Sequence, residues 1–260
     1  MRNARATRID RILGILGRTD RKSAVKLNLA AIANVATIVA CLLVTLAVVP
    51  TLKTAWSGST KAADGKAQAI EHVDNLRIAM PKANVKGDPR AKVIVIEFAD
   101  FQCPFCGKYA RETFPEIQRQ YIDAGQAMYG YRHFPLVDIH PLARDAGKAA
   151  LCAGDQQKFW PMHDRLLLDR HSLALADLMT DADHLGLDRA RFDACLNAPA
   201  PLLDEDIAEA RRLGVIATPT FFVGTVEPDG NVRVTSKIHG ARALPIFRSA
   251  FAEALRLSSS

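Results

Sequence analysis

Apolar residues follow three patterns along the chain. Residues 27–49 form a run of 23 residues without a charged side chain, and a helix of that length spans roughly 34 Å, enough to cross a hydrocarbon core of about 30 Å. Lys92–Phe98 contains four consecutive apolar β-branched residues, a pattern typical of a strand buried on both faces. From residue 140 to 213 the apolar residues recur mainly at helical spacing. The chain is therefore predicted to have a membrane-spanning helix followed by an α/β domain.

Within that domain the pattern predicts a βαβ unit, a helical block and a closing ββα unit. After the strand Lys92–Phe98, a helix begins near Pro104, where proline is tolerated, and runs to about Asp123 with a kink or break at Pro115. The strand Ala127–Phe134 follows and is expected to lie parallel to the first. The helical block is expected to contain Pro141–Ala153, Gln157–Leu168, Leu173–Leu185, Arg189–Asn197 and Leu202–Leu213. The closing unit is expected to contain the strands Thr220–Val223 and Val232–Ile238, joined by a turn at 227–231, and the helix Leu244–Leu257.

The distribution of charge supports a membrane segment near the N-terminus. The chain has a net charge of +6, and residues 1–27 hold eight basic and two acidic residues, which accounts for all of it. The positive-inside rule then places residues 1–26 in the cytoplasm as a basic arm and everything after the 27–50 anchor outside. Because the rest of the chain is neutral and has no dense basic patch, we do not expect it to bind nucleic acid.

A cleaved signal peptide is the alternative reading of the N-terminus. Such peptides have an apolar core of about 7–15 residues and a cleavage site between small residues, and residues 48–51 offer no good site. Both readings export the domain into a compartment that permits disulfides. Residues 51–85 are predicted to be a stalk or linker with a short exposed helix at 62–79, and residues 86–260 are predicted to be the folded domain.

Cys103 and Cys106 are the strongest chemical signal in the chain. Cysteines three residues apart at a helix start face the same side, and the unpaired N–H groups there favour a thiolate at the first one. We therefore predict that Cys103 exchanges disulfides with substrates and that Cys106, one turn deeper, resolves the mixed disulfide. A structural disulfide or half of a zinc site are the alternatives, but no second ligand pair is present, so no metal is expected. Cys41, inside the apolar run, is read as a packing residue.

Residues 95–106, VIEFADFQCPFC, resemble the active-site segment of the DsbA-like thioredoxin-fold thiol–disulfide oxidoreductases. The resemblance covers roughly residues 85–255. The family's inserted helical domain matches about 138–214, and its cis-proline loop matches Thr218-Pro219. The fold implied is an α/β thioredoxin fold with an inserted α-helical domain, preceded here by the transmembrane helix.

The resemblance also implies roles for individual residues. Pro219 is expected to be cis, and Thr218, Pro104 and Phe105 are expected to contact the substrate; a trans proline is the alternative. Glu97 interrupts an apolar strand, so its pKa should be raised, which suits proton exchange with Cys106; the alternative is that Glu97 points to solvent. Phe101 and Phe105 are both expected to be exposed.

Cys152 and Cys195 lie in the predicted helical block. In an exported domain they suggest a structural disulfide, which some members of the family have in this region. Two buried thiols are the alternative.

The function expected is the oxidation of unfolded or exported cysteine-containing proteins outside the cytoplasm, at the inner or cytoplasmic membrane, with the catalytic domain facing the periplasm or the cell exterior. A membrane redox partner would reoxidise the Cys103–Cys106 pair, and no cofactor is expected. Phe105 stands where the best-known oxidases have histidine, and Thr218 resembles isomerase-like relatives. A disulfide isomerase or reductase kept reduced by a membrane donor therefore stays open, as does a non-catalytic chaperone-like binding module.

Overall fold

The computed structural model describes residues 70–259, in which seven strands form one sheet. The order across the sheet is β1, β7, β6, β4, β5 and β3, with β2 also paired to β7. Strands β4 and β5 are parallel and all other pairs are antiparallel. The strands are β1 (Ile70–His72), β2 (Arg77–Ala79), β3 (Val85–Lys86), β4 (Val93–Ala99), β5 (Met128–His133), β6 (Thr220–Val226) and β7 (Asn231–His239).

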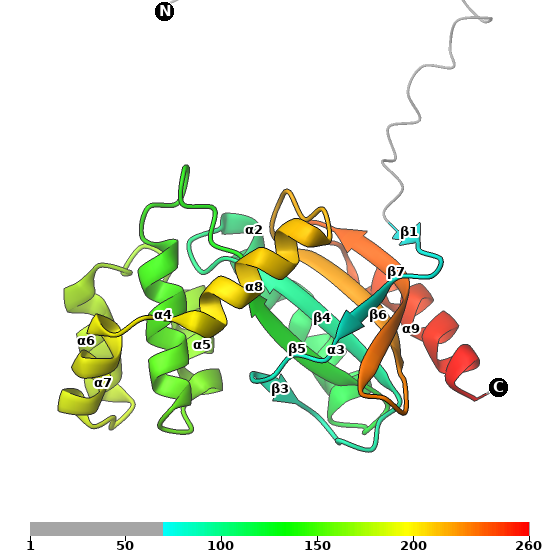
Figure 1. Ribbon diagram of the computed structural model, residues 1–260, viewed down its shortest axis with the longest axis horizontal. Helices are drawn as coiled ribbons and strands as arrows, with labels where there is room; N and C mark the ends of the chain where they lie inside the picture. Colours follow the sequence, from blue (N-terminus) through cyan, green and yellow to red (C-terminus); the bar gives the residue numbers. More distant parts are fainter. Residues whose placement is uncertain (1–69, 260) are drawn as a thin grey trace, which may run out of the picture. The chain divides into compact units, whose positions relative to one another are not determined.

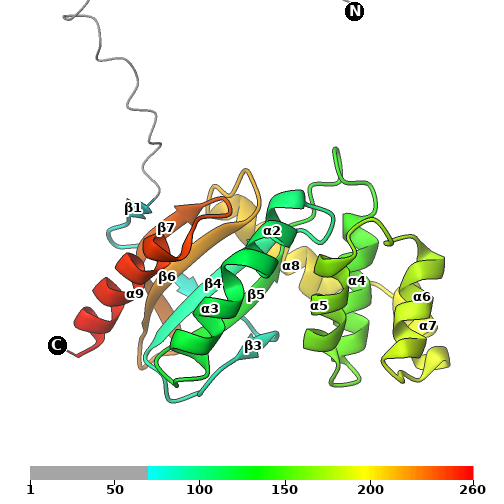
Figure 2. The ribbon, with the colours of Figure 1, turned by 180° about the vertical axis from the view of Figure 1, so that it is seen from behind.

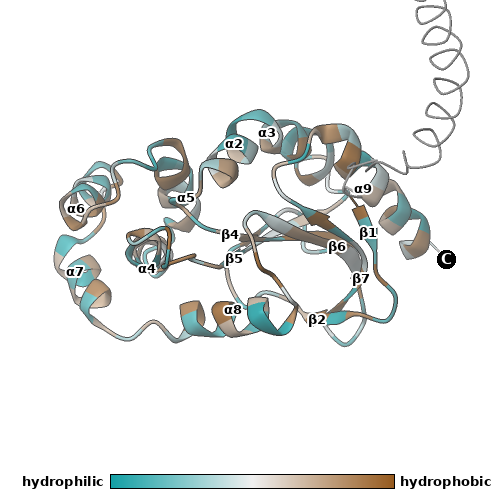
Figure 3. Ribbon diagram, turned by 90° about the horizontal axis from the view of Figure 1, so that it is seen from above, coloured by the Kyte–Doolittle hydropathy of each residue, from teal (hydrophilic) through white to brown (hydrophobic). Residues whose placement is uncertain are grey.

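Helices cover both faces of the sheet and extend beyond the side where β5 lies. On one face lie α2 (Pro104–Glu112), α3 (Phe114–Ile117) with the π-helical turn η1 (Gln118–Ile122), and α9 (Leu244–Ser258), as Figure 2 shows. On the other face lies α8 (Pro201–Arg212) (Figure 3). The inserted group consists of α4 (Ala143–Gly154), α5 (Phe159–Leu168), α6 (Leu175–His184) and α7 (Arg189–Asn197), and it stands beside the sheet (Figure 1). The predicted break at Pro115 is present as the boundary between α2 and α3.

Strand β4 is buried along its whole length because both of its faces are covered. Side chains alternate between the two faces of a strand. Val93 and Val95 pack in the cluster that includes α9, whereas Ile94 and Ile96 pack in the cluster that includes Ala210 of α8. Glu97 continues the first series, so its carboxyl points toward the face that α2 covers.

The prediction of a linker at 51–85 and of an exposed helix at 62–79 is wrong for the described part. Residues 70–86 contain β1, β2 and β3 instead. Ile78 is 1% exposed and packs against the sheet, and β2 forms backbone pairs with β7 from Arg77 to Ala79. The exposed edge of β7 supplies hydrogen-bond partners that a short local pattern does not reveal.

The basic arm at 1–26, the predicted anchor at 27–50 and the linker up to residue 69 lie outside the described residues. Between residues 70 and 259, none of the helices has the length and apolar character needed to cross a bilayer.

Candidate active site

Cys103 and Cys106 lie where β4 passes into α2. Cys103 is the N-cap of α2, Pro104 is its first residue, and the Cys103 carbonyl accepts a hydrogen bond from Gly107 N. Both cysteines are reduced thiols. Cys103 is 4% exposed and Cys106 is fully buried, whereas Pro104 is exposed and Phe105 is 60% exposed. Cys103 is therefore only slightly accessible to solvent, and Cys106 is not accessible.

The surroundings of Cys103 favour its thiolate. The Cys106 thiol donates to the Cys103 sulfur, and this contact contributes most to lowering the pKa of Cys103 to about 6. Burial opposes the shift, while the backbone N–H groups of Phe105 and Cys106 support it. Burial raises the pKa of Cys106 well above its usual value, and the hydrogen bond to Cys103 raises it further. The two thiols are thus chemically different, and Cys103 is the one whose thiolate is favoured at neutral pH.

Alkylation of the reduced protein by iodoacetamide should report this difference. We expect the rate at Cys103 to rise with pH and to reach half of its maximum near pH 6, because only the thiolate reacts. In Cys106→Ala the largest favourable contact is removed, so the midpoint should move toward the pKa of an ordinary thiol, about 8.5. Mass spectrometry of the labelled peptide measures both curves, and coincident curves would contradict the assigned cause.

The loop before β6 lies beside Cys103. The Thr218–Pro219 peptide bond is cis, and the Thr218 carbonyl accepts a hydrogen bond from Cys103 Sγ at 3.4 Å. Thr218 and Pro219 are buried, but Ile216, two residues earlier, is 85% exposed. Two segments meet at the Cys103 sulfur, the start of α2 and the loop before β6. Each carries an exposed apolar side chain, Phe105 in the first and Ile216 in the second.

Glu97 interacts electrostatically with both cysteines and is 1% exposed, so the alternative in which it faces solvent is wrong. Burial raises the pKa of Glu97 to about 8, and the Tyr129 hydroxyl, which donates to Glu97 Oε2, opposes that shift. The charge of Cys103 adds to the increase. A carboxyl with this pKa is mostly protonated at neutral pH.

Two polar residues that the sequence analysis did not select hold the active-site loop. Asp100 accepts hydrogen bonds from Gln102 N at 2.7 Å and from Leu136 N at 2.9 Å, and it lies 2.7 Å from His140 Nδ1. Gln102 Oε1 accepts a hydrogen bond from Leu142 N at 2.9 Å. These bonds fasten the segment before Cys103 to the loop between β5 and α4. No local signal marked the role of Asp100, because two of its three partners, Leu136 and His140, lie 36 and 40 residues away.

A family model described as thioredoxin matches residues 80–236. The chain belongs to the thioredoxin family. Its structure is DsbA-like: α-DsbA1 of Wolbachia pipientis is 25% identical with a TM-score of 0.59, over 70% of this chain and 95% of that one. A thioredoxin-like oxidoreductase of Silicibacter pomeroyi is also 25% identical, with a TM-score of 0.53 over 68% and 94% of the two chains.

Curated relatives of this thioredoxin-family chain include much longer proteins. The Na(+)/H(+) antiporter NhaA 1 of Salinispora arenicola is 39% identical over 171 residues, which is 62% of this chain and 26% of the antiporter. The chain thus spans about a quarter of the length of that relative.

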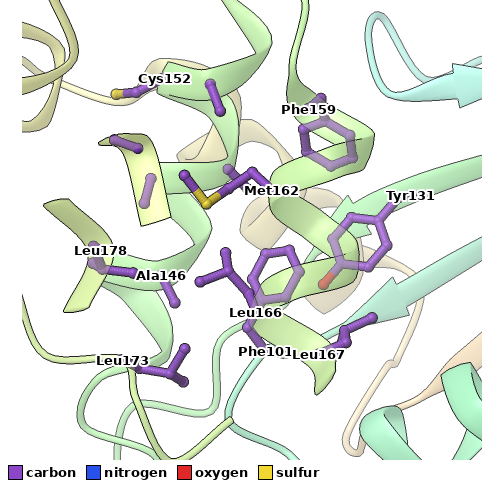
Figure 4. Close-up of a cluster of buried hydrophobic side chains, with 14 of the residues drawn as sticks. Phe101, Tyr131, Ala146, Cys152, Phe159, Met162, Leu166, Leu167, Leu173 and Leu178 are labelled. Atoms are coloured by element: carbon purple, nitrogen blue, oxygen red, sulfur yellow. The ribbon is translucent and has the colours of Figure 1, made fainter. Parts of the chain in front are cut away.

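Phe101 is not part of the exposed surface of this DsbA-like domain, and the prediction that it is exposed is wrong. It is 1% exposed and stacks on Tyr131, with ring centroids 5.2 Å apart. Figure 4 shows Phe101 among side chains of the inserted helices, including Leu166 and Met162. The chain turns after β4, and the inserted helices cover the Phe101 side chain, which follows that strand. Phe101 therefore connects the active-site loop to the core of the helical domain.

Cys152 of α4 and Cys195 of α7 are joined by a disulfide, with an S–S distance of 1.98 Å and Cα atoms 5.7 Å apart. They are not two separate thiols. The bond closes a loop with a sequence separation of 43 residues and ties two helices of the insertion in this thioredoxin-family domain. Among the described residues no group of three or more histidine, cysteine or acidic side chains is placed to hold a metal ion.

Removing this disulfide should destabilise the domain without changing the site. We expect the Cys152→Ala, Cys195→Ala double variant to lose about 2–4 kcal/mol of unfolding free energy, because its unfolded chain is less constrained. Urea unfolding measures the loss, and the Cys103 alkylation curve should be unchanged in the folded variant. A shifted alkylation curve would show instead that the bond shapes the active site.

Proposed function

We propose that this chain is a membrane-anchored, extracytoplasmic thiol–disulfide oxidoreductase that introduces disulfides into exported proteins. The observation that carries the proposal is the Cys103 sulfur, which lies at the start of α2, 3.4 Å from the Thr218 carbonyl oxygen, with its pKa lowered to about 6. A stabilised thiolate stabilises the reduced form of the pair, which makes the Cys103–Cys106 disulfide a stronger oxidant.

The exchange proceeds in two steps. A substrate thiolate attacks Cys103 Sγ of the oxidised pair, the Cys103–Cys106 bond breaks, and Cys106 leaves and takes a proton from Glu97. The second substrate thiolate then attacks the substrate sulfur of the mixed disulfide, and Cys103 leaves as a thiolate. Two electrons pass from the substrate dithiol to the cysteine pair, and the low pKa of Cys103 favours the second departure.

The substrates proposed are unfolded or exported proteins that contain cysteines. The exposed side chains of Phe105 and Ile216 offer apolar contacts to segments that are not yet buried in a fold. The apolar residues 27–49 would hold the domain at the inner or cytoplasmic membrane, facing the periplasm or the cell exterior. A membrane redox partner would then remove the two electrons, so the Cys103–Cys106 pair is the redox group that the proposal requires and no cofactor is invoked.

The second candidate is an isomerase or reductase that a membrane donor keeps reduced. It is favoured by Phe105 between the cysteines, since a histidine there would further stabilise the thiolate, and by Thr218 before the cis proline. The chemistry at Cys103 is the same, and the direction of electron flow is opposite.

The redox state of the pair in living cells distinguishes the two candidates. Cells that express the full chain are quenched with acid and alkylated with a reagent that adds mass to each free thiol. We expect the pair to be oxidised at steady state, with Cys103→Ser, Cys106→Ser marking the position of a band that carries no label at this site. A pair found reduced would overturn the oxidase and support the isomerase or reductase.

A further inference from the structure

Tyr129 of β5 makes the direct polar contact to Glu97. Tyr129 is 1% exposed, and its hydroxyl donates a hydrogen bond to Glu97 Oε2. The other oxygen, Oε1, is buried and has no hydrogen-bond partner among the described residues. One oxygen of the carboxyl is therefore held, and the other is available for a proton.

The groups that surround Glu97 make this hydrogen bond significant. Electrostatic interactions link Glu97 to Cys103, Cys106 and Tyr109 on the α2 side and to Tyr131 on β5, and each of these groups is neutral or negative. The Tyr129 hydroxyl is the contact that favours the ionised form of Glu97. A hydrogen bond to a charged group contributes more than one between neutral groups, especially where water is excluded.

The Tyr129 ring is held by side chains from β3, α3, η1 and α5. Phe114 and Trp160 pack on the ring, with centroids 4.6 Å and 5.8 Å away. Lys86 pairs with Tyr129 across β3 and β5, and its ammonium lies 4.9 Å and 4.1 Å from the centroids of the same two rings. Gln118 Oε1 accepts a hydrogen bond from Lys86 Nζ at 3.4 Å. These contacts restrict the ring and so fix the direction of its hydroxyl.

We propose that Tyr129 is a positioning residue for proton transfer between Glu97 and Cys106. It holds Glu97 Oε2, leaves Oε1 to exchange the proton, and stabilises the carboxylate that remains. When a thiolate opens the Cys103–Cys106 disulfide, the carboxylic acid of Glu97 gives its proton to the leaving Cys106 sulfur. The resulting carboxylate then keeps the hydrogen bond from Tyr129. The inference rests on the proposed function but not on the direction of electron flow, since the reverse step returns the same proton.

The test is the pH profile for reduction of the oxidised full chain by dithiothreitol, followed by stopped flow. The wild type should show an inflection from Glu97 above the ordinary carboxyl pKa of 4.5, because burial raises the pKa of this group. In Tyr129→Phe the inflection should move up by about one pH unit, because the ionised carboxyl loses its donor. In Glu97→Gln the inflection should be absent, and adding Tyr129→Phe to that variant should produce no further shift. If Tyr129 had only a structural role, Tyr129→Phe would slow the reduction equally in the wild-type and the Glu97→Gln protein.

Two further proteins make the test independent of how well Tyr129→Phe folds. Tyr131→Phe removes a neighbouring buried hydroxyl that has no hydrogen-bond partner among the described residues, and it should keep the wild-type inflection. A 3,5-difluorotyrosine introduced at position 129 is a stronger donor of nearly the same shape, so it should move the inflection to lower pH. An inflection that stays in place in either the phenylalanine or the fluorinated protein would overturn the inference. A wild type that does not react with dithiols would instead overturn the proposed function.

Discussion

Replacing Cys103 by serine is expected to reduce dithiol oxidation on the order of 10³-fold or more, as is usual when a nucleophile is removed. The serine hydroxyl does not ionise near neutral pH and forms no disulfide. Cys106 does not replace it, because it is fully buried and its pKa is raised well above the usual value. The rate is measured by acid quenching and mass spectrometry of a peptide with two cysteines. Retained activity in Cys103→Ser would contradict the assignment of the nucleophile.

Cys106→Ser is the matched control because it removes the second sulfur and keeps the nucleophile. Incubated with a disulfide-containing protein, its Cys103 thiolate should attack the disulfide and release one substrate thiolate. The mixed disulfide should then persist, because the thiol that would resolve it is missing. We expect a covalent complex that dithiothreitol dissolves in Cys106→Ser and no such complex in Cys103→Ser. Equal complex formation by both variants would mean that another cysteine reacts.

The parts of the site that sequence predicts are those encoded by local pattern. Four apolar β-branched residues identify β4, and the spacing of Cys103 and Cys106 beside Pro104 identifies the helix start that activates the thiol. Thr218-Pro219 was selected through family resemblance, since the residues themselves do not show that two segments 115 residues apart meet. The strand β4 and the helix start each depend on few neighbours in the chain, whereas the Thr218-Pro219 loop does not.

The features that were missed depend on register and on packing between distant segments. Tyr129 contacts Glu97 because β4 and β5 pair in one particular register, with Val95 beside Tyr129. A shift of one residue would turn the tyrosine to the other face. Phe101 is buried by helices that follow about 50 residues later, and β2 forms because the edge of β7 accepts it. No local pattern near Phe101 or in residues 70–86 carries that information.

Glu97→Gln is expected to slow disulfide exchange and, at the same time, to make the folded protein more stable at neutral and alkaline pH. In the folded state the pKa of Glu97 is raised to about 8 by burial, against an ordinary value of 4.5. Between these values the folded protein keeps a proton that the unfolded chain has lost. The free energy of unfolding therefore falls as pH rises from about 4.5 to about 8. The contribution lost by pH 8 is on the order of 3–5 kcal/mol.

Urea unfolding of the oxidised proteins at pH 4, 6 and 8 measures this effect, because the Cys103–Cys106 pair does not titrate when it is a disulfide. Glutamine stays uncharged, and its carbonyl can still accept the hydrogen bond from Tyr129. The difference in stability between Glu97→Gln and the wild type should therefore be constant below pH 4.5 and grow toward pH 8 in favour of the variant. Asp206, whose pKa is raised by burial to about 7, affects both proteins equally and cancels in the difference.

Glu112→Gln is the matched control on α2, since the Glu112 side chain is 62% exposed and its removal changes no buried charge. A Glu97→Gln protein whose stability follows the wild type at every pH would show that the carboxyl is ionised and compensated in the folded state. If the prediction holds, the carboxyl that we propose as the proton donor to Cys106 destabilises the domain above pH 4.5. Its presence in an otherwise apolar strand is then not explained by stability, which agrees with the proposed role in proton transfer.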